Sequence, residues 1–551
     1  MKDFFMKNAD ITVLLLLCTA VLFIFTGHYG DILLDVGREV YYPLRILEGK
    51  VLYKDLFVIY GPSAYLWNAL LYKIFGVNLT ILYIAGALCS YGIVAAVYLI
   101  AQRFLSKFLS FSVGFFTIAT GVCSVSLFNF TFPYSWAMLY GTLLCLWSLF
   151  CLLKFKDTEK TKYLFAAAFL SGSAVSCKYD FLLYSLIILL VILKTRDLKI
   201  ILKSLLSFAL IPFVSFGILF LQGLRWCDLI NTLRILNVMA HTKSLEYFYR
   251  HSGVFFSVQI LMYWIIGFLK CILCFGAITA GVRILKKKNE FGVILTVIGI
   301  VLTYFLCDPA IFAFLIAALT FFAITGYKTL KNDKSVLLLI LSIIALSLKS
   351  FWGLTPLNYG NYYCSLVLIG FFVLLYDVID KNLQKSGAIF ILAISLWFLI
   401  FNASQLPNLN GKIKSLHGTI YTDKNYAIPI NQAINFLNSQ DKDKTAVIFP
   451  EGLIINLLSE KEQISEDFYN SLIPLYTETF KESELIKYFR IHRPNFILFT
   501  NQKMNSYNTG LICRDYGRYF CGYVLENYDF VKTFGKDFKI VIFYDKMLRE
   551  Q

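Results

Sequence analysis

Long apolar runs separated by short polar segments dominate the first 400 residues of the chain. A membrane-spanning helix needs about 20 predominantly apolar residues. The pattern therefore predicts a mainly α-helical, polytopic membrane bundle of about 13 spans within residues 1–401. The predicted spans centre near Leu17, Leu88, Phe116, Leu144, Phe169, Ile188, Pro212, Ile272, Ile298, Leu315, Ser342, Gly370 and Ser395. The runs around Phe169 and Ile188 flank a polar turn, so a single re-entrant pair is the alternative there.

The pattern changes after Phe401, where polar residues become frequent and apolar runs become short. Residues 402–551 are therefore expected to form a small α/β domain of about 150 residues. The expected helices are Ile430–Leu437 and Leu485–Phe489, and the expected strands are Ala446–Phe449, Phe496–Phe499 and Ile540–Tyr544.

Composition supports a membrane protein and excludes several other classes. Hydrophobic residues make up 58% of the chain and charged residues 16%, with a mean hydropathy of +0.67. These values exclude a disordered protein, a coiled coil and a typical soluble enzyme. The net charge of +16 does not indicate nucleic-acid binding, because the basic residues lie in short clusters between apolar runs.

The basic clusters also predict the orientation. If the N-terminus is cytoplasmic and the first apolar run is a retained span, every short basic cluster falls on the inner side, as the positive-inside rule requires. We therefore expect a multi-pass protein of the inner (plasma) membrane whose residues 402–551 are extracytoplasmic. The clusters are Arg103/Lys107, Lys154/Lys156/Lys160/Lys162, Lys194/Arg196/Lys199, Arg283/Lys286/Lys287/Lys288, Lys328/Lys331/Lys334 and Lys381/Lys385.

Most of the 13 cysteines lie in or beside apolar runs, where they behave as small apolar residues. Cys271 and Cys274 form a CxxC inside such a run, without a second pair or a histidine partner, which favours packing over a metal site. Cys513 and Cys521 lie in the polar C-terminal region and can form a disulfide if that region is extracytoplasmic.

The first outer loop, residues 28–76, carries charges of both signs between two predicted spans. Val36, Val40, Leu44 and Leu47 recur at helical spacing, which predicts an amphipathic helix lying on the membrane surface. After a break at Gly61-Pro62, residues 65–75 are expected to form a second interfacial helix. Such a loop suits a site that binds an anion and also needs a carboxylate; the alternative is a solvated loop with surface ion pairs.

Several stretches resemble a known family. They are Asp35-Val-Gly-Arg38-Glu39, Gly49-Lys-Val-Leu-Tyr53-Lys-Asp55, Tyr60-Gly-Pro62, Asn68 to Gly76, Asn129-Phe-Thr-Phe-Pro133-Tyr-Ser-Trp136 and Ser176-Cys-Lys178-Tyr-Asp180. They are similar to stretches of bacterial GT-C membrane glycosyltransferases, which include relatives of protein O-mannosyltransferases and of the aminoarabinose transferase for lipid A. The resemblance covers most of the membrane region.

The resemblance implies transfer of a sugar from a polyprenyl-phosphate-linked donor to a glycan, lipid or protein acceptor on the outer face, with inversion. An inverting displacement needs a carboxylate to take the acceptor's proton and cations to stabilise the leaving phosphate. Asp35 occupies the acidic position of the family and is the expected base, with Asp31 as the rival. Many relatives have an Asp-Glu pair where this chain has Asp35-Val36. Asp35 could instead cap a helix or pair with Arg38.

Arg38 and Lys178 are the expected phosphate ligands, since Arg binds bidentately and Lys acts as a point charge. The Lys178–Asp180 pair at a membrane boundary is a functional candidate, and snorkelling of the lysine is its alternative. Relatives carry a basic residue near the aromatic loop Gly353–Tyr363, and here Lys349 precedes that loop. Tyr and Asn in this loop could contact a sugar or form an interfacial belt. The further donor-site candidates are Glu39, Tyr60, His241, Tyr359 and Asn361.

No zinc-binding spacing is found, and no metal site is predicted. A divalent cation, Mg²⁺ or Mn²⁺, stays open as a cofactor, with Asp31, Asp35, Glu39 and Asp55 as ligand candidates. Two other classes of function compete with the transferase. One is a multi-span transporter or flippase for a lipid-linked or envelope substrate, and the other is a scaffold whose C-terminal domain recruits partners. A scaffold would tolerate Asp35→Asn, and a transferase would not.

Overall fold

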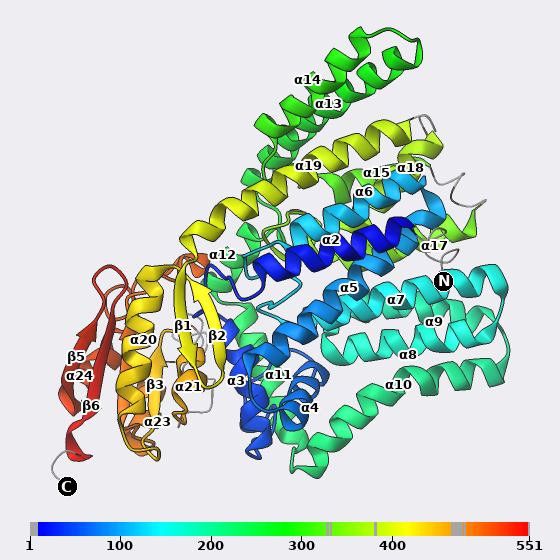
Figure 1. Cartoon of the computed structure of the whole chain (residues 1–551). Helices are drawn as coiled ribbons and strands as arrows, with labels where there is room; N and C mark the ends of the chain where they lie inside the picture. Colours follow the sequence, from blue (N-terminus) through cyan, green and yellow to red (C-terminus); the bar gives the residue numbers. More distant parts are fainter. Residues whose placement is uncertain are drawn as a thin grey trace.

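The computed structural model describes residues 9–326, 330, 333–378, 383–463, 478 and 481–548. A bundle of long helices forms one part, and a smaller α/β part follows it at the C-terminal end of the chain (Figure 1). The bundle helices are α2 (Ala9–Phe25), α5 (Leu79–Phe104), α6 (Lys107–Thr117), α7 (Trp136–Thr158), α8 (Thr161–Cys177), α9 (Leu182–Lys194), α10 (Leu198–Leu221), α13 (Val258–Lys286), α14 (Phe291–Leu306), α15 (Leu315–Thr325), α17 (Lys334–Ser347), α18 (Cys364–Val378) and α19 (Gln384–Gln405).

Each of the predicted span centres lies in one of these helices, which confirms a mainly helical fold. Within the described residues, five helices are long and apolar enough to cross a membrane: α5, α7, α10, α13 and the helix that begins at Gln384. Other apolar helices are shorter, so the count of 13 spans stays a prediction. With 13 residues, α9 is about 20 Å long, less than the ~30 Å of a hydrocarbon core, and this length fits the re-entrant alternative for α8 and α9.

The first outer loop contains the two predicted helices, α3 (Val36–Leu47) and α4 (Ser63–Phe75). The helix α4 keeps an exposed apolar face with Trp67, Ile74 and Phe75, as expected of an interfacial helix. The prediction for α3 needs correction, because ten of its twelve residues are buried. It packs between α4 and α21 (Leu453–Ser459), and a Cβ on Gly37 would lie 2.5 Å from the backbone nitrogen of Ile454. The C-terminal part thus covers α3, which does not lie on the membrane surface alone.

The α/β part begins with an antiparallel hairpin of β1 (Gly411–Ser415) and β2 (Gly418–Thr422). A four-stranded sheet follows, with the order β3-β4-β6-β5. Here β3 (Ala446–Phe449) runs parallel to β4 (Phe496–Thr500), whereas β6 (Ile540–Asp545) is antiparallel to β4 and to β5 (Tyr528–Phe534). The helices are α20 (Lys424–Asn438), α21, α23 (Glu482–Ile491) and α24 (Arg518–Asn527). All five elements expected after Phe401 are confirmed; β1, β2, β5, α21 and α24 were not predicted.

The sheet has an apolar face on each side. Ile448, Leu498 and Ile542 belong to the core that continues into the helical bundle. Val447, Phe449 and Ile497 pack instead into a second core with α23 and α24. Main-chain hydrogen bonds join the hairpin to the bundle, from Tyr29 N to Tyr421 O (2.9 Å) and from Leu79 N to His417 O (2.8 Å).

The cysteines considered in the sequence differ in their state. Cys513 and Cys521, which the sequence allows to pair, form a disulfide. Cys271 and Cys274 are free thiols on α13.

Candidate functional site

Lys178 is a buried cation at the end of α8, where its backbone nitrogen caps the helix by bonding to Ala174 O. Its side chain is 2% exposed, and its Nζ lies over the rings of Tyr60 (4.4 Å) and Tyr359 (5.0 Å). Within the part of the chain that the structure describes, this Nζ has no hydrogen-bond partner. Burial and the charge of Lys349 together lower the pKa of Lys178 to about 7, against the raising effects of Asp180 and Glu39. An ammonium held in this way is poised for an anionic partner.

A second lysine shares the carboxylate beside Lys178. Asp180, in the single 3₁₀ turn Tyr179–Phe181, places Oδ2 3.6 Å from Lys178 Nζ and accepts a hydrogen bond from Lys349 Nζ at 2.9 Å. Lys349 Nζ also lies 4.2 Å from the centre of the Tyr359 ring. Burial raises the pKa of Asp180, but the two lysines outweigh it and hold that pKa below its usual range. The Lys178–Asp180 pair expected from the sequence is thus part of a group of three, in which Lys349 is a second cation.

Three tyrosine hydroxyls connect this pair to the first outer loop. Tyr60 and Tyr134 are hydrogen-bonded at 2.8 Å, and Tyr134 is bonded in turn to Tyr359. All three side chains are buried. Burial raises the pKa of Tyr359, and the charges of Asp180 and Asp35 both raise it further, so the two carboxylates act on one ring. We name this group the cation–tyrosine cluster; it comprises Arg38, Tyr60, Tyr134, Lys178, Lys349 and Tyr359, with the carboxylates of Asp35 and Asp180 at its edges.

Asp35 and Arg38 form the loop side of the cluster. Arg38 is 7% exposed and donates a hydrogen bond to Asp35 Oδ1 at 2.6 Å, whereas Asp35 is 22% exposed. Among the described residues, none donates to Asp35 Oδ2. Asp35 precedes α3 at the N-cap position without capping it through its side chain, and its φ is +57°. A positive φ at a residue other than glycine costs about 1–3 kcal/mol and is common at functional sites.

The rival acid, Asp31, does not lie on a helix with Asp35, because residues 31–35 precede α3 as an irregular turn. Asp31 Oδ1 accepts from the backbone nitrogens of Leu33 (3.0 Å) and Leu34 (3.2 Å), and Oδ2 accepts from Gln502 (3.1 Å). Burial raises the pKa of Asp31, and these hydrogen bonds lower it. Both carboxylate oxygens of Asp31 are therefore occupied by hydrogen bonds. Oδ2 of Asp35 accepts none from the described residues, so Asp35 is the acid with an available oxygen.

Three residues of the C-terminal part reach this turn, and the sequence analysis missed all of them. Glu451 accepts from the backbone nitrogen of Asp35 at 2.7 Å, and Gln502 donates to Asp31. Tyr507 is half-buried; its desolvation raises its pKa, and the charges of Asp35 and Glu451 raise it further. These residues follow Asp35 by more than 400 positions, so no local pattern links them to it.

Glu39 is buried among structural partners. Its carboxylate accepts from Tyr65 Oη (2.6 Å) and from the backbone nitrogen of Trp136 (2.9 Å), while Arg38 Nε lies 4.0 Å away. Burial raises the pKa of Glu39 to about 7, against the lowering effects of Arg38 and of the two hydrogen bonds. Glu39 therefore fixes α3 against α4 and α7 and so positions Arg38.

Two of the expected donor-site residues lie elsewhere. His241 is exposed at the end of α11 (Trp226–Ala240), where its Nδ1 contacts Asn237 O at 2.7 Å. Asn361 is buried in the loop Gly353–Tyr363, but its amide donates to the backbone oxygens of Thr120 and Phe128. Its role is to hold this loop against the π-helical end of α6. Only Tyr359 of that loop reaches the cluster.

The candidate metal ligands do not come together. Asp31, Asp35 and Glu39 each have separate partners, and Asp55 accepts from Val51 N within its own turn. In the described ranges, no three His, Cys, Asp or Glu side chains lie close enough to hold a metal ion.

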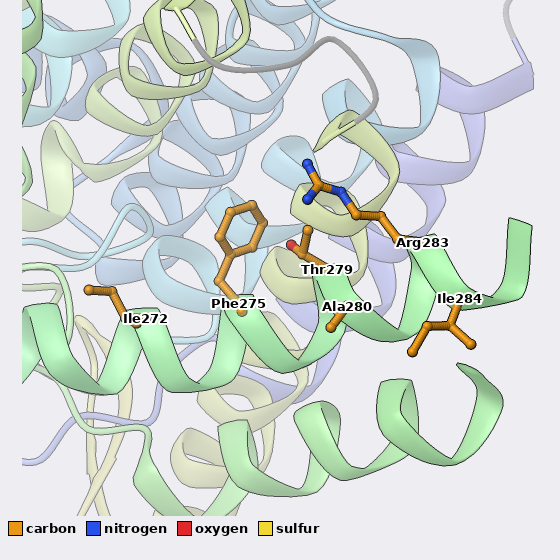
Figure 2. A pocket seen from close by; sticks show the side chains of 7 residues that line it. Ile272, Phe275, Thr279, Ala280, Arg283 and Ile284 are labelled. Atoms are coloured by element: carbon orange, nitrogen blue, oxygen red, sulfur yellow. The ribbon is translucent and has the colours of Figure 1, made fainter. Parts of the chain in front are cut away.

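A separate apolar groove of about 530 Å³ lies along α13 (Figure 2). Ile272, Phe275, Ala280 and Ile284 line it, with Thr279 and one charged residue, Arg283. None of these residues belongs to the cation–tyrosine cluster, so the groove is not the candidate site.

Known proteins match this chain in structure and not in sequence. No family model matches the chain, and no curated protein sequence matches it. Solved structures do. ArnT from Cupriavidus metallidurans bound to undecaprenyl phosphate aligns with 97% of this chain and 97% of its own, at 11% identity and a TM-score of 0.47. The Archaeoglobus fulgidus oligosaccharyltransferase in complex with Zn and sulfate aligns with 97% of this chain and 73% of its own, at 14% identity and a TM-score of 0.47.

A third structure, the archaeal oligosaccharyltransferase AglB in complex with an inhibitory peptide and a dolichol-phosphate, covers 90% of this chain and 70% of its own, at 12% identity and a TM-score of 0.47. Each of these structures is something the chain is similar to, and similarity at this level assigns no role to any residue of this chain.

Proposed function

We propose that this protein is a membrane glycosyltransferase. It transfers a sugar from a polyprenyl-phosphate-linked donor to a glycan, lipid or protein acceptor on the outer face of the membrane, with inversion at the anomeric carbon. The observation that carries the proposal is the buried ammonium of Lys178, with Lys349 beside it and the charge of Arg38 acting on Tyr60. Buried charges are costly, and cations gathered at the end of apolar helices suit the phosphate of a lipid whose tail stays in the bilayer.

Lys178 and Lys349 bind the phosphate as point charges, and Arg38 adds a planar donor on the loop side. As the acceptor oxygen attacks the anomeric carbon, the bond between that carbon and the phosphate oxygen breaks. The electron pair passes to the phosphate, where the cations stabilise the growing charge. A site enclosed by protein strengthens this effect, because water screens the charges less.

Asp35 is the general base that takes the acceptor's proton. Its free oxygen, its partial exposure and its strained backbone support this role over Asp31, whose two oxygens hold the turn. Arg38 donates a hydrogen bond to Oδ1 of Asp35 and keeps the carboxylate oriented. The buried rings of Tyr60 and Tyr359 exclude water from the phosphate and hold the lysines in place.

Asp35→Asn is the direct test, in proteoliposomes supplied with a polyprenyl-phosphate sugar and an acceptor extract. The rate of transfer should fall about 10³-fold, within the range for losing a general base, while the unfolding temperature stays near the wild-type value, because Asn still accepts from Arg38. Asp31→Asn is the matched control. It should act mainly on the unfolding temperature, which falls, and only slightly on the rate of transfer. Wild-type turnover by Asp35→Asn, or movement of the lipid across the bilayer without transfer, would overturn the proposal.

A further inference from the structure

One carboxylate oxygen in the cluster serves two lysines. Oδ2 of Asp180 accepts from Lys349 Nζ at 2.9 Å and lies 3.6 Å from Lys178 Nζ. An ammonium can donate three hydrogen bonds. Across the described residues, Lys178 Nζ finds no acceptor within hydrogen-bond distance. Oδ2 of Asp180 thus leaves the N–H donors of Lys178 without a partner. The two ammonium groups and the ring of Tyr359 therefore surround a position that a larger anion would fill better.

The three charged groups differ in access. The side chain of Lys178 is 2% exposed, whereas those of Lys349 and Asp180 are 23% and 31% exposed. The residues around the accessible side are apolar and exposed themselves: Tyr179, Leu182, Leu183 and Leu348. On a helical membrane protein, such an exposed apolar surface faces lipid. A phosphate carried on a lipid tail would thus meet the Asp180–Lys349 pair before it reached Lys178.

We propose that Asp180 is an internal competitor of the lipid phosphate. Its carboxylate occupies the position between the two lysines that the phosphate takes, and it is displaced toward the exposed side when the phosphate enters. A phosphate monoester carries more negative charge than a carboxylate and offers three acceptor oxygens, so it can bind both ammonium groups at once. Asp180 lowers the affinity for the phosphate and thereby speeds its release after transfer. This inference rests on the proposed function and assigns Asp180 a role in tuning the affinity for the lipid phosphate that remains after transfer.

The test compares binding of undecaprenyl phosphate to the full-length protein in detergent micelles, measured by calorimetry. Asp180→Asn keeps the shape of the side chain and removes its charge, so the Kd should fall about tenfold, the equivalent of one modest charge interaction. Lys349→Gln should raise the Kd. In the double variant, the gain from Asp180→Asn should shrink, because the two residues act on the same phosphate. Inorganic phosphate, titrated in parallel, separates recognition of the phosphate group from recognition of the lipid tail.

The outcomes separate this inference from the proposed function. Asp35→Asn should bind undecaprenyl phosphate like the wild type although it transfers sugar about 10³-fold more slowly. An unchanged or higher Kd for Asp180→Asn would overturn the competitor role alone, because Asp180 would then only orient the lysines. If Asp180→Asn fails to fold, Asp180→Ser serves as the second variant and should also lower the Kd. Absence of binding by the wild type itself would overturn the proposed function together with this inference.

Discussion

Two buried ion pairs in this protein show opposite designs. In the C-terminal part, Arg493 binds Asp545 through two hydrogen bonds of 2.6 Å, and Asp545, which is 0% exposed, also accepts from the backbone nitrogen of Met547. In the cation–tyrosine cluster, Lys178 is equally buried, but its nearest carboxylate oxygen lies 3.6 Å away. The first pair satisfies its own charges, whereas the second leaves a desolvated cation that something else must satisfy. An ion pair whose hydrogen bonds are all made (a saturated pair) supports the fold, and a buried cation without such bonds (in an unsaturated pair) indicates a site for a ligand.

The largest effect on stability should come from the saturated pair. Asp545→Leu removes the charge that compensates Arg493, so the free energy of unfolding of the C-terminal part should fall by about 3 kcal/mol, at the lower end of the range for a broken buried pair because Arg493 is partly exposed. Thermal unfolding followed by near-ultraviolet circular dichroism measures this change. A loss below about 0.5 kcal/mol, the level of a surface pair, would contradict the structural role.

The unsaturated pair should respond in the opposite way. Lys178→Met replaces a desolvated ammonium by a flexible apolar side chain among the rings of Tyr60 and Tyr359. Stability should stay the same or rise by about 1 kcal/mol, since a costly buried charge is removed and Asp180 keeps Lys349. Binding of undecaprenyl phosphate should weaken by at least about tenfold. A variant that unfolds instead would make Lys178 a structural residue.

The pH dependence of binding sharpens the same contrast. Burial lowers the pKa of Lys178 to about 7, so the ammonium loses its proton as the pH rises above this value, and the Kd for undecaprenyl phosphate should increase between pH 7 and about 9. The phosphate monoester is already largely dianionic there. Lys178→Arg should flatten this increase, because guanidinium stays charged. Glu39, whose pKa is also about 7, titrates in the wild type and in Lys178→Arg alike. A difference between the two pH profiles therefore comes from residue 178.

The same shift predicts how stability changes with pH. Between pH 7 and 10.5 the unfolded chain keeps the proton on Lys178 that the folded protein has lost. The unfolded state therefore binds more protons, and the free energy of unfolding should rise with pH across this window. Chemical denaturation at several pH values measures it, with Lys178→Met as the control in which this contribution disappears.

The smallest effect is expected at the ring that both lysines contact. Tyr359→Phe keeps the aromatic face near Lys178 and Lys349 but removes the hydroxyl bonded to Tyr134. Binding of undecaprenyl phosphate should weaken about threefold, whereas Tyr359→Leu, which removes the aromatic face as well, should weaken it more. Equal effects of the two substitutions would show that the hydroxyl, and not the ring, matters.

The periodicity of apolar residues predicted most of the fold. It failed for a strand whose side chains are mostly exposed and for the contact of a helix with a distant part of the chain. The strand Ala446–Phe449 was predicted to the residue, because four successive apolar side chains are all buried. The edge strand Tyr528–Phe534 was missed, because its interior residues, including Asp529 and Lys532, are not buried and give no apolar alternation. The amphipathic pattern of Val36–Leu47 located a helix, but it contained no information about the helix of the C-terminal part that covers it.

The candidate site was predictable only as far as its residues share a motif. Asp35 and Arg38 stand three positions apart, and Lys178 and Asp180 two, so local charge marked both pairs. Lys349 joins Asp180 across 169 positions, and only the packing of α8, α9 and α17 unites them. His241 and Asn361 lie outside the cation–tyrosine cluster, because residue type and an outer loop do not determine which way a side chain points. Asp31 was distinguished from Asp35 by hydrogen bonds from backbone and Gln502 that no sequence pattern contains.

The hydrogen bond from the backbone nitrogen of Asp35 to Glu451 spans 416 positions of the chain. It means that residues 402–551 cannot be removed as a detachable module without loosening the turn that carries the acid. A macromolecule that docks on that module and shifts Glu451 would disturb the backbone at Asp35, together with the turn that Gln502 holds through Asp31.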